Sequence, residues 1–248
     1  EVMRVMTCDY GNPSSLHTKG FEAGRILEQS REVVANALAA DKSEIYFTSG
    51  GTEGNNLAVL GGAAAMKRRG KRVVTTSIEH PSVYDAASQL EKDGFKVIRL
   101  KPDIYGNITS EQLDEAINSD TVLVSVMLVN NEMGSVLPVQ DICKIVKRKN
   151  SPALIHCDAV QAFGKTDIKA ARLGADIITV SSHKIHGPKG AGAIYLKKGR
   201  RILPRTFGGL QESSLRCGTE ALPLIAGFAQ AVREFNTEDC RKVRELNL

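Results

Sequence analysis

The chain has 248 residues, and its 33 lysines and arginines against 28 aspartates and glutamates give a formal net charge of +5. Hydrophobic residues make up 42% and charged residues 25%, which is typical of a folded globular protein and excludes a disordered chain, a collagen or a coiled coil. The longest mainly apolar run, residues 121–129, is too short for a membrane-spanning helix. No secretion leader opens the sequence, so secretion is not expected. The sequence starts at Glu1 and not at Met, so we expect N-terminal residues to be missing.

Composition also limits which binding partners and which cellular compartment are expected. Aromatic residues are 5% and Trp is absent, so stacking platforms for nucleic acid are not expected. Short basic runs at residues 67–69, 147–149 and 197–201 are interpreted as solvated ends of helices and loops. The five cysteines are an odd number without C-x-x-C spacing, which favours neither a disulfide framework nor a zinc knuckle. A reducing, cytoplasmic setting is therefore expected.

Helical and strand patterns alternate along the chain. In chain order, we expect a helix at 21–40, a strand at 44–48, a helix at 52–69, a strand at 72–77, a helix at 81–92, a strand at 96–100, a helix at 110–118, a strand at 121–129, a helix at 138–149, a strand at 153–157, a helix at 169–173, strands at 176–181 and 191–196, and a helix at 221–235. This alternation predicts one α/β domain: a mostly parallel sheet of the seven-stranded type with helices on both faces.

Polar residues follow several of these strands, where ligands gather in such folds. Thr48-Ser49-Gly50-Gly51-Thr52 comes after a strand and opens a helix, whose free N–H groups and positive dipole end suit a phosphate. The segment matches neither the P-loop nor the G-x-G-x-x-G pattern. A tight turn into a helix is the alternative interpretation.

Two further strands end in candidate site residues. His80 follows the strand at 72–77, and a capping or core histidine is the alternative. Asn130 and Asn131 end the long apolar strand, and two adjacent amides are costly to bury unless they bind something. Turn formation is the alternative for this pair.

The segments LIHCDAVQ and ITVSSHKIHGPKG carry the remaining candidates. Asp158 emerges from an apolar strand, so it needs a cationic partner or hydrogen-bond donors, unless it caps the next helix. Gln161 follows one short turn later. Ser181, His183 and Lys184 come directly after a strand, which makes Lys184 a candidate for Schiff-base chemistry, with an ordinary surface lysine as the alternative.

A metal site is not expected from the histidines and Cys157. His156 and Asp158 would share a strand face while Cys157 points away, so the spacing does not bring enough ligands together. The separate strand-end residues instead form one chemical set: an amine, an acid, an aromatic-capable histidine and a helix start. A phosphorylated pyridine aldehyde needs this set, which predicts pyridoxal 5'-phosphate as the cofactor.

Seven sequence blocks carry a family resemblance. They are YGNPSSLH (10–17), EIYFTSGGTEGNNLA (44–58), EHPSV (79–83), VNNEMGSVLP (129–138), HCDAVQAFGK (156–165), SSHKIHGPKGAGAIY (181–195) and GGLQESSLRCGTE (208–220). In this order they resemble the cysteine desulfurases, fold-type I pyridoxal phosphate enzymes of the class V aminotransferase group. The resemblance covers nearly the whole chain.

The resemblance implies a role for each matching residue around the phosphate and the aldehyde. Lys184 would carry the cofactor and act as the catalytic base. Ser181 and His183 would help to hold the phosphate, together with Gly51 and Thr52 at the helix start.

The same resemblance implies the contacts of the ring and of a second subunit. His80 would stack on the ring and move protons, Asp158 would pair with the ring nitrogen, and Gln161 would bond the ring hydroxyl. Asn131 would lie beside the ring hydroxyl and the substrate carboxylate. Thr219 would reach the phosphate of the other subunit, which implies a homodimer. Cys217 replaces the family's more usual Ser or Ala and is interpreted as a tolerated small residue.

The implied activity is release of sulfur from L-cysteine as alanine forms, with transfer to an enzyme persulfide and then to an acceptor for iron–sulfur clusters or thiolated tRNA. Residues 1–235 would form the cofactor-binding large domain, and residues 236–248 would begin the connection to a C-terminal small domain. None of the five cysteines matches the family's sulfur-accepting loop. The alternatives are a truncated or non-catalytic cofactor-binding scaffold, and a selenocysteine lyase or cysteine sulfinate desulfinase.

Overall fold

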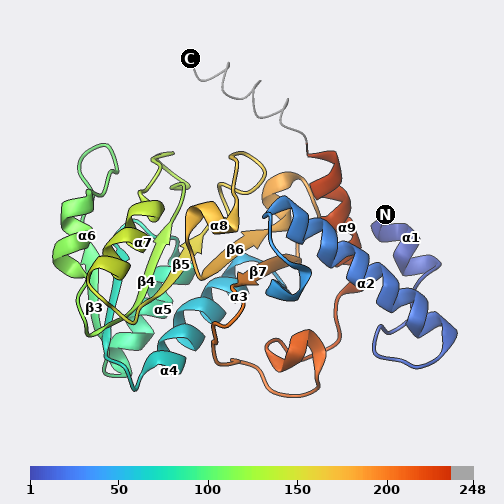
Figure 1. The fold of residues 1–248 in the computed structure, drawn as a ribbon. Helices are drawn as coiled ribbons and strands as arrows, with labels where there is room; N and C mark the ends of the chain where they lie inside the picture. The colour runs from blue at the N-terminus through green and yellow to red at the C-terminus, as the bar shows by residue number, and fades with distance from the viewer. Residues whose placement is uncertain (236–248) are drawn as a thin grey trace, which may run out of the picture.

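A computed structural model describes residues 1–235 and contains a seven-stranded sheet (Figure 1). The strands are β1 (Ile45–Thr48), β2 (Arg72–Thr76), β3 (Lys96–Leu100), β4 (Thr121–Met127), β5 (Leu154–Asp158), β6 (Ile177–Ser181) and β7 (Gly192–Leu196). Their order across the sheet is β1-β7-β6-β5-β4-β2-β3, and β7 alone among them runs opposite to all the others. The predicted α/β class and mostly parallel sheet are confirmed.

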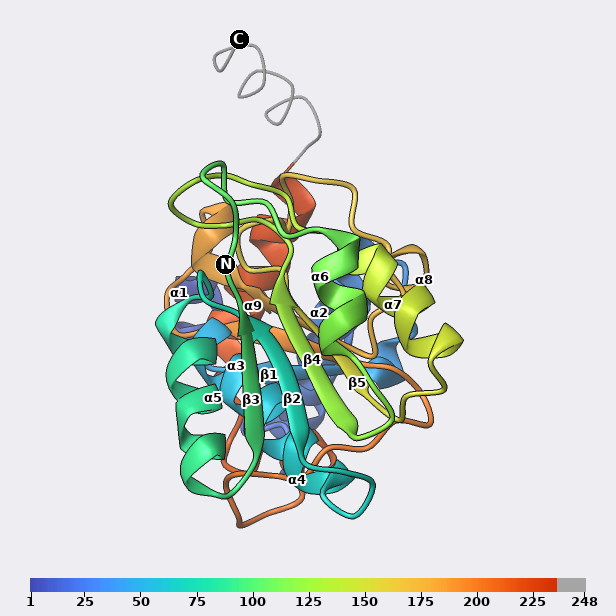
Figure 2. The same cartoon turned by 90° about the vertical axis from the view of Figure 1, so that its left-hand side faces the viewer.

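Helices cover both faces of the sheet. They are α1 (Val2–Thr7), α2 (Thr18–Ala37), α3 (Gly51–Asn56), α4 (Gly62–Met66), α5 (Pro81–Lys92), α6 (Ser110–Ala116), α7 (Val139–Arg148), α8 (Ala170–Leu173) and α9 (Leu222–Glu234). One apolar core joins the sheet to residues 57–59, α4 and α5, and a second joins its other face to α2, α6, α7, α8 and α9. Figure 2 shows α5 on one side of β3, β2 and β4, with α6 and α7 on the other.

The expected elements are present, and their ends differ in ways that local chemistry explains. The predicted helix 21–40 begins earlier, at Thr18, because the His17 side chain accepts a hydrogen bond from the Gly20 N–H at 3.2 Å. The predicted helix 52–69 begins at Gly51 and continues through a π-helical turn, η2 (Leu57–Gly61), into α4. Helix α1 was not predicted.

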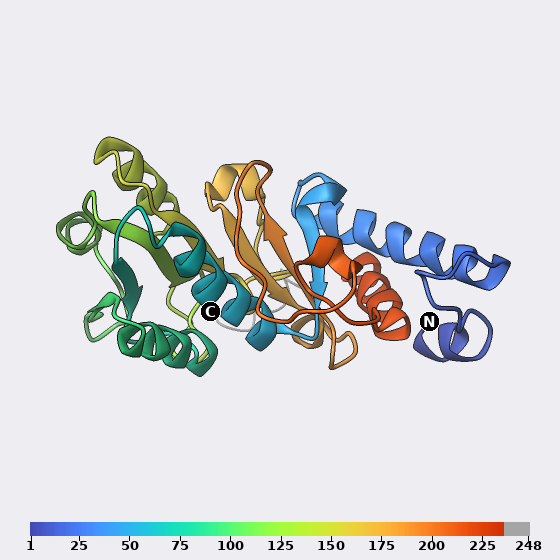
Figure 3. The ribbon, with the colours of Figure 1, turned by 90° about the horizontal axis from the view of Figure 1, so that it is seen from below.

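Short 3-10 turns complete the described chain: η1 (Lys42–Glu44), η3 (Ser182–Ile185) and η4 (Gln211–Ser214). Helices α1, α2 and α9 gather beyond the β1 end of the sheet, which Figure 3 shows from below. None of the helices within residues 1–235 combines the length and apolar character that a bilayer crossing requires. The expectation for residues 236–248 lies outside the described residues.

One irregularity of the sheet lies between β2 and β4. Their register pairs Arg72 with Thr121 and Val74 with Val124, and it shifts between Arg72 and Val73. No pairing of these two strands is recorded for Thr75 and Thr76, whereas β2 stays paired with β3 as far as Thr76. The carboxyl ends of β2 and β4 therefore separate, next to the strand ends that carry the candidate site residues.

Candidate active site

The carboxyl ends of β2, β4, β5 and β6 lie at the same end of the strands, because these neighbouring strands are parallel. His80, Asn131, Asp158 and Lys184 follow these four ends. Asp158 ends β5, and Lys184 lies in η3 directly after the adjacent β6. The fold thus brings strand-end residues that are far apart in sequence to one end of the strands, as ligand sites in this fold class require.

The helix start that follows β1 lies at the same end of the strands. Strand β1 runs antiparallel to β7, which runs antiparallel to β6, so the carboxyl ends of β1 and β6 point the same way. A Cβ added at Gly51 would lie 2.8 Å from Val160 Cγ2 and 3.9 Å from Ser181 Cβ. Only glycine fits this approach, which places the first turn of α3 beside Ser181 and close to the segment after Asp158.

Asp158 is the most buried charged candidate, with 6% of its surface exposed. Its Oδ2 accepts from Asn55 Nδ2 at 2.7 Å, and its Oδ1 accepts from the Val160 N–H at 2.9 Å. Burial raises its pKa, while the hydrogen bonds from Val160 and Asn55 and the charge of His80 oppose the rise. Within residues 1–235 it makes no ion pair, so this carboxylate lacks the cationic partner that burial calls for.

His80 caps helix α5, as its alternative interpretation foresaw, and it also connects to Asp158. Its Nδ1 accepts from the Ser82 N–H at 3.1 Å and lies 2.7 Å from Ser82 Oγ. Asn55 Nδ2 donates to Ser82 Oγ at 2.9 Å as well as to Asp158. Because Nδ1 accepts from a backbone N–H, the neutral ring carries its proton on Nε2.

Asn55 and Ser82 were missed as site residues. Both belong to blocks that resemble the family, but neither follows a strand end directly. Asn55 lies one helical turn beyond Gly51 and is 1% exposed, and its Oδ1 has no hydrogen-bond partner in the described part of the chain. A polar amide on the sheet-facing side of a helix is the sequence signal that identifies such a residue.

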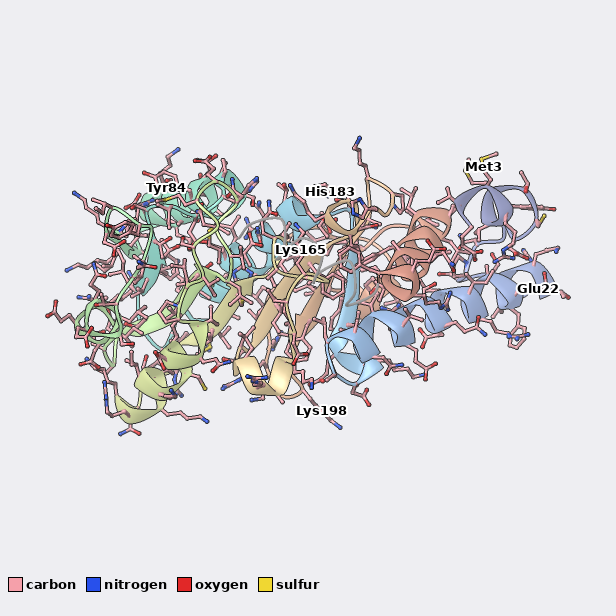
Figure 4. All side chains as sticks on the ribbon, turned by 90° about the horizontal axis from the view of Figure 1, so that it is seen from above. Met3, Glu22, Tyr84, Lys165, His183 and Lys198 are labelled. Atoms are coloured by element: carbon pink, nitrogen blue, oxygen red, sulfur yellow. The ribbon has the colours of Figure 1, made fainter. Side chains whose placement is uncertain are left out.

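Lys184 and His183 are more exposed to solvent than Asp158. Lys184 is half-buried and His183 is exposed. His183 Nδ1 lies 2.8 Å from Ser181 Oγ, and burial, with the charges of Lys184 and Lys189, lowers the His183 pKa. Figure 4 shows His183 and Lys198 at opposite ends of the strands, which separates the basic run 197–201 from the candidate site.

Within residues 1–235, no hydrogen bond or ion pair connects the remaining three candidates, Gln161, Asn131 and Thr219, to the site residues described above. Gln161 Oε1 accepts from Lys165 at 3.3 Å. Asn131 is exposed, while its neighbour Asn130 is buried and forms the turn that its alternative interpretation describes, accepting from the N–H groups of Glu132 and Met133. Thr219 is exposed on the segment after η4, which an ion pair between Arg216 and Glu53 ties to α3.

His156 is a buried neutral link between strands. Its ring lies 2.8 Å from Ser125 Oγ of β4 and 3.0 Å from Thr179 Oγ1 of β6. Burial lowers its pKa to about 3. Both nitrogens are therefore occupied, and no group of three or more possible metal ligands is found among the described residues.

The sequence matches the family Aminotransferase class-V over residues 1–247. The chain belongs to this family. It is 42% identical over 230 residues to Cysteine desulfurase IscS 1 of Archaeoglobus fulgidus, covering 93% of this chain and 59% of that protein. It is 45% identical over 243 residues to a NifS/IcsS protein homolog of Lactobacillus delbrueckii, covering 96% of this chain and 62% of that protein.

Solved structures agree with these relatives. A NifS-like protein superposes with a TM-score of 0.94 at 40% identity, covering 98% of this chain and 67% of that one. A structure described as SspA in complex with cysteine superposes with a TM-score of 0.90 at 36% identity, covering 98% and 72%. The chain spans about three fifths of the length of the curated relatives it matches.

The residues of the strand-end cluster fit the pyridoxal phosphate that a class V aminotransferase fold implies. Asp158 is a buried carboxylate without a cationic partner, and a protonated pyridine nitrogen is such a partner. Gly51 leaves room at the start of α3, where N–H groups and Ser181 can receive a phosphate. Lys184 supplies an amine at the end of the strand next to Asp158.

Proposed function

We propose that this chain is the cofactor-binding part of a pyridoxal-phosphate-dependent cysteine desulfurase, which converts L-cysteine to L-alanine. The observation that carries the proposal is the buried, cation-free Asp158 on the strand adjacent to the one that presents Lys184. The names of the curated relatives support it. One solved relative is described in complex with cysteine, which supports the substrate.

Each residue of the cluster receives a role in this proposal. Lys184 holds the cofactor aldehyde and takes the proton from the substrate Cα. Asp158 keeps the ring nitrogen protonated, and Asn55 fixes the carboxylate that does so. Ser181, His183, Gly51 and Thr52 bind the phosphate. When bound, the cofactor supplies an electron-withdrawing ring that stabilises negative charge at Cα.

His80 is proposed to stack on the ring and to move a proton through Nε2, since Nδ1 already accepts from Ser82. Gln161 and Asn131 are proposed to contact the ring hydroxyl, with Asn131 also near the substrate carboxylate. To make these contacts, the two side chains have to turn when the cofactor binds, because Gln161 now bonds Lys165 and Asn131 is exposed.

The overall reaction transfers one sulfur atom. The C–S bond of cysteine breaks, the sulfur passes to an acceptor thiol as a persulfide, and alanine leaves. We propose that the accepting thiol lies outside residues 1–235, because the family resemblance matches none of the cysteines to the sulfur-accepting loop; among them, Cys157 is also buried. The proposal also includes a homodimer in which Thr219 reaches the phosphate of the second subunit, a sulfur-acceptor protein as partner, and a cytoplasmic location.

The test compares the wild-type chain with Lys184→Ala after incubation with pyridoxal phosphate. The wild type should show a visible absorption band that borohydride abolishes, and borohydride should fix the cofactor mass to Lys184 in a peptide map. Lys184→Ala should show neither signal. Lys198 lies far from His183 in Figure 4, so Lys198→Ala is the matched control and should retain both.

The substrate is tested separately on the full-length protein, by measuring alanine formed from cysteine. A wild-type protein that stays colourless with added cofactor contradicts the proposal. If the protein is coloured but forms no alanine from cysteine, the proposed cofactor site is supported and the proposed desulfurase activity is contradicted.

A further inference from the structure

The gap between the carboxyl ends of β2 and β4 is filled by Glu79, which has no role in the function proposed above. Glu79 is 7% exposed and follows β2 by three residues. Its Oε1 accepts from Thr76 Oγ1 at 2.7 Å, and its two oxygens lie 3.1 and 3.0 Å from the Met127 N–H. The carboxyl therefore replaces the strand-to-strand hydrogen bonds that the separated β2 and β4 no longer make.

A second side chain crosses the same gap in the opposite direction. Asn130, after β4, donates through Nδ2 to the Ile78 carbonyl at 2.9 Å. Its Oδ1 shapes the turn that presents Asn131. Glu79 and Asn130 together tie the segment that carries His80 to the end of β4, so two candidate site residues depend on this pair of contacts.

The charge of Glu79 matters as well as its shape. Burial raises its pKa to about 8, against the hydrogen bonds from Thr76 and Met127, and the Asp158 carboxylate adds to the rise. Its titratable neighbours on the adjacent elements are Asp158 and Cys157 of β5, with His80 next in sequence. A neutral Glu79 leaves Asp158 as the charged carboxylate of the site.

We propose that Glu79 is a positioning residue: its buried carboxyl group, which no cationic side chain of residues 1–235 bonds, bridges the separated ends of β2 and β4, holds His80 in place and leaves Asp158 as the carboxyl that pairs with the cofactor. This inference rests on the proposed function for its effect on the cofactor, but the bridge itself does not. Glu79 touches neither substrate nor cofactor in this account.

The experiment compares Glu79→Gln and Glu79→Ala in the full chain. Glutamine keeps the shape and the neutral charge, so Glu79→Gln should bind pyridoxal phosphate within about threefold of wild type. Glu79→Ala leaves the Met127 N–H without an acceptor, which should lower the stability of the fold by about 1–3 kcal/mol. Because it also releases the segment that carries His80, it should weaken cofactor binding, by about tenfold for a loss of about 1.4 kcal/mol. Amide hydrogen exchange at Met127, measured without cofactor, should speed up in Glu79→Ala and stay slow in Glu79→Gln.

A pH titration of the cofactor's visible band separates charge from mere structural support. The wild type should show an alkaline change near pH 8 that Glu79→Gln lacks. Neighbouring threonines provide a matched pair: Thr76→Val removes a donor to Glu79, whereas the Thr75 hydroxyl has no partner in the described residues, so Thr75→Val should leave all readouts unchanged.

Several results would overturn the proposal. One is a Glu79→Ala protein with wild-type cofactor affinity and slow exchange at Met127. Another is a Glu79→Gln protein as impaired as Glu79→Ala, which would mean that the charged form is needed. If Glu79→Ala does not fold, Glu79→Gln and the threonine pair decide. If wild type binds no cofactor, the proposed function fails, and exchange at Met127 still decides whether the bridge exists.

Discussion

Two buried glutamates lie near opposite ends of the same sheet, Glu79 beside β2 and Glu212 beside the edge strand β1. Each accepts a backbone N–H from a strand, Met127 for Glu79 and Phe47 for Glu212. Arg31 binds both oxygens of Glu212 at 2.7 and 2.9 Å, whereas no cationic side chain of the described chain bonds Glu79. Similar burial therefore supports two different states, a charged pair at the sheet edge and a neutral acid beside the candidate site.

The pair of Arg31 and Glu212 closes the outer edge of β1. Arg31 donates to the Ile45 carbonyl at 2.9 Å, and Glu212 accepts from the Phe47 N–H at 2.8 Å, so the two side chains bond the strand as a neighbouring strand would. Glu212, Ser213 and Ser214 all have positive φ angles, of 46°, 55° and 62°. Such conformations are unfavourable for residues other than glycine, so the ion pair holds a strained segment in place.

Arg31→Ala should have the largest effect on stability. It leaves Glu212 buried without its cation, which costs about 3–5 kcal/mol in the free energy of unfolding. Urea denaturation measures this loss. Glu28→Gln is the control, since Glu28 is exposed and also bonds Arg31; breaking an exposed pair should change the unfolding free energy by less than about 1 kcal/mol. Equal losses in the two variants would contradict a special role of the buried partner Glu212 over the exposed partner Glu28.

A pair of glycines tests how closely α3 must approach the site side of the sheet. A Cβ at Gly54 would lie 2.6 Å from Thr179 Cγ2, so Gly54→Ala forces α3 away from β6 and should cost about 1–3 kcal/mol. At Gly62 of α4 the nearest atom is 3.6 Å away, and alanine favours the helix, so Gly62→Ala should be neutral or stabilising. Thermal unfolding compares them, and equal melting temperatures would contradict this packing.

The fold was predictable from the sequence because alternation of apolar strands and amphipathic helices is a local signal. Strand-end residues such as Asp158 and Lys184 were predictable for the same reason, together with the parallel sheet that gathers strand ends. Glu79 and Asn55 were not predicted, because their importance arises from partners distant in sequence, Met127 and Asp158. The separation of β2 from β4 is a tertiary feature that no local pattern encodes.

The neutral state of Glu79 predicts a pH dependence of folding stability. Its pKa is about 8 when folded against an ordinary value of 4.5, so the folded state holds the proton more tightly. Stability should fall as pH rises from 4.5 to 8, by up to about 1.4 kcal/mol per pH unit. Glu79→Gln should reduce this slope in urea titrations at several pH values, leaving the part that Asp158 contributes with the same sign. An unchanged slope would contradict a neutral buried acid.

His156 should give a slope of the opposite sign. Its pKa is about 3 when folded against 6.5 ordinarily, so the unfolded chain binds a proton that the folded chain refuses. Its contribution is complete above pH 6.5 and is lost as pH falls below that value, by at most about 1.4 kcal/mol per pH unit. Between pH 4.5 and 6.5 the two slopes oppose each other, so the wild type should be less pH-dependent there than either variant.

His156→Gln removes this titration, and its stability should fall with rising pH across the same window because Glu79 then acts unopposed. His186→Gln is the matched control, since His186 is exposed, and it should keep the wild-type profile. If His156→Gln and wild type lose stability in parallel toward acid, the Ser125–His156–Thr179 link does not hold a neutral ring.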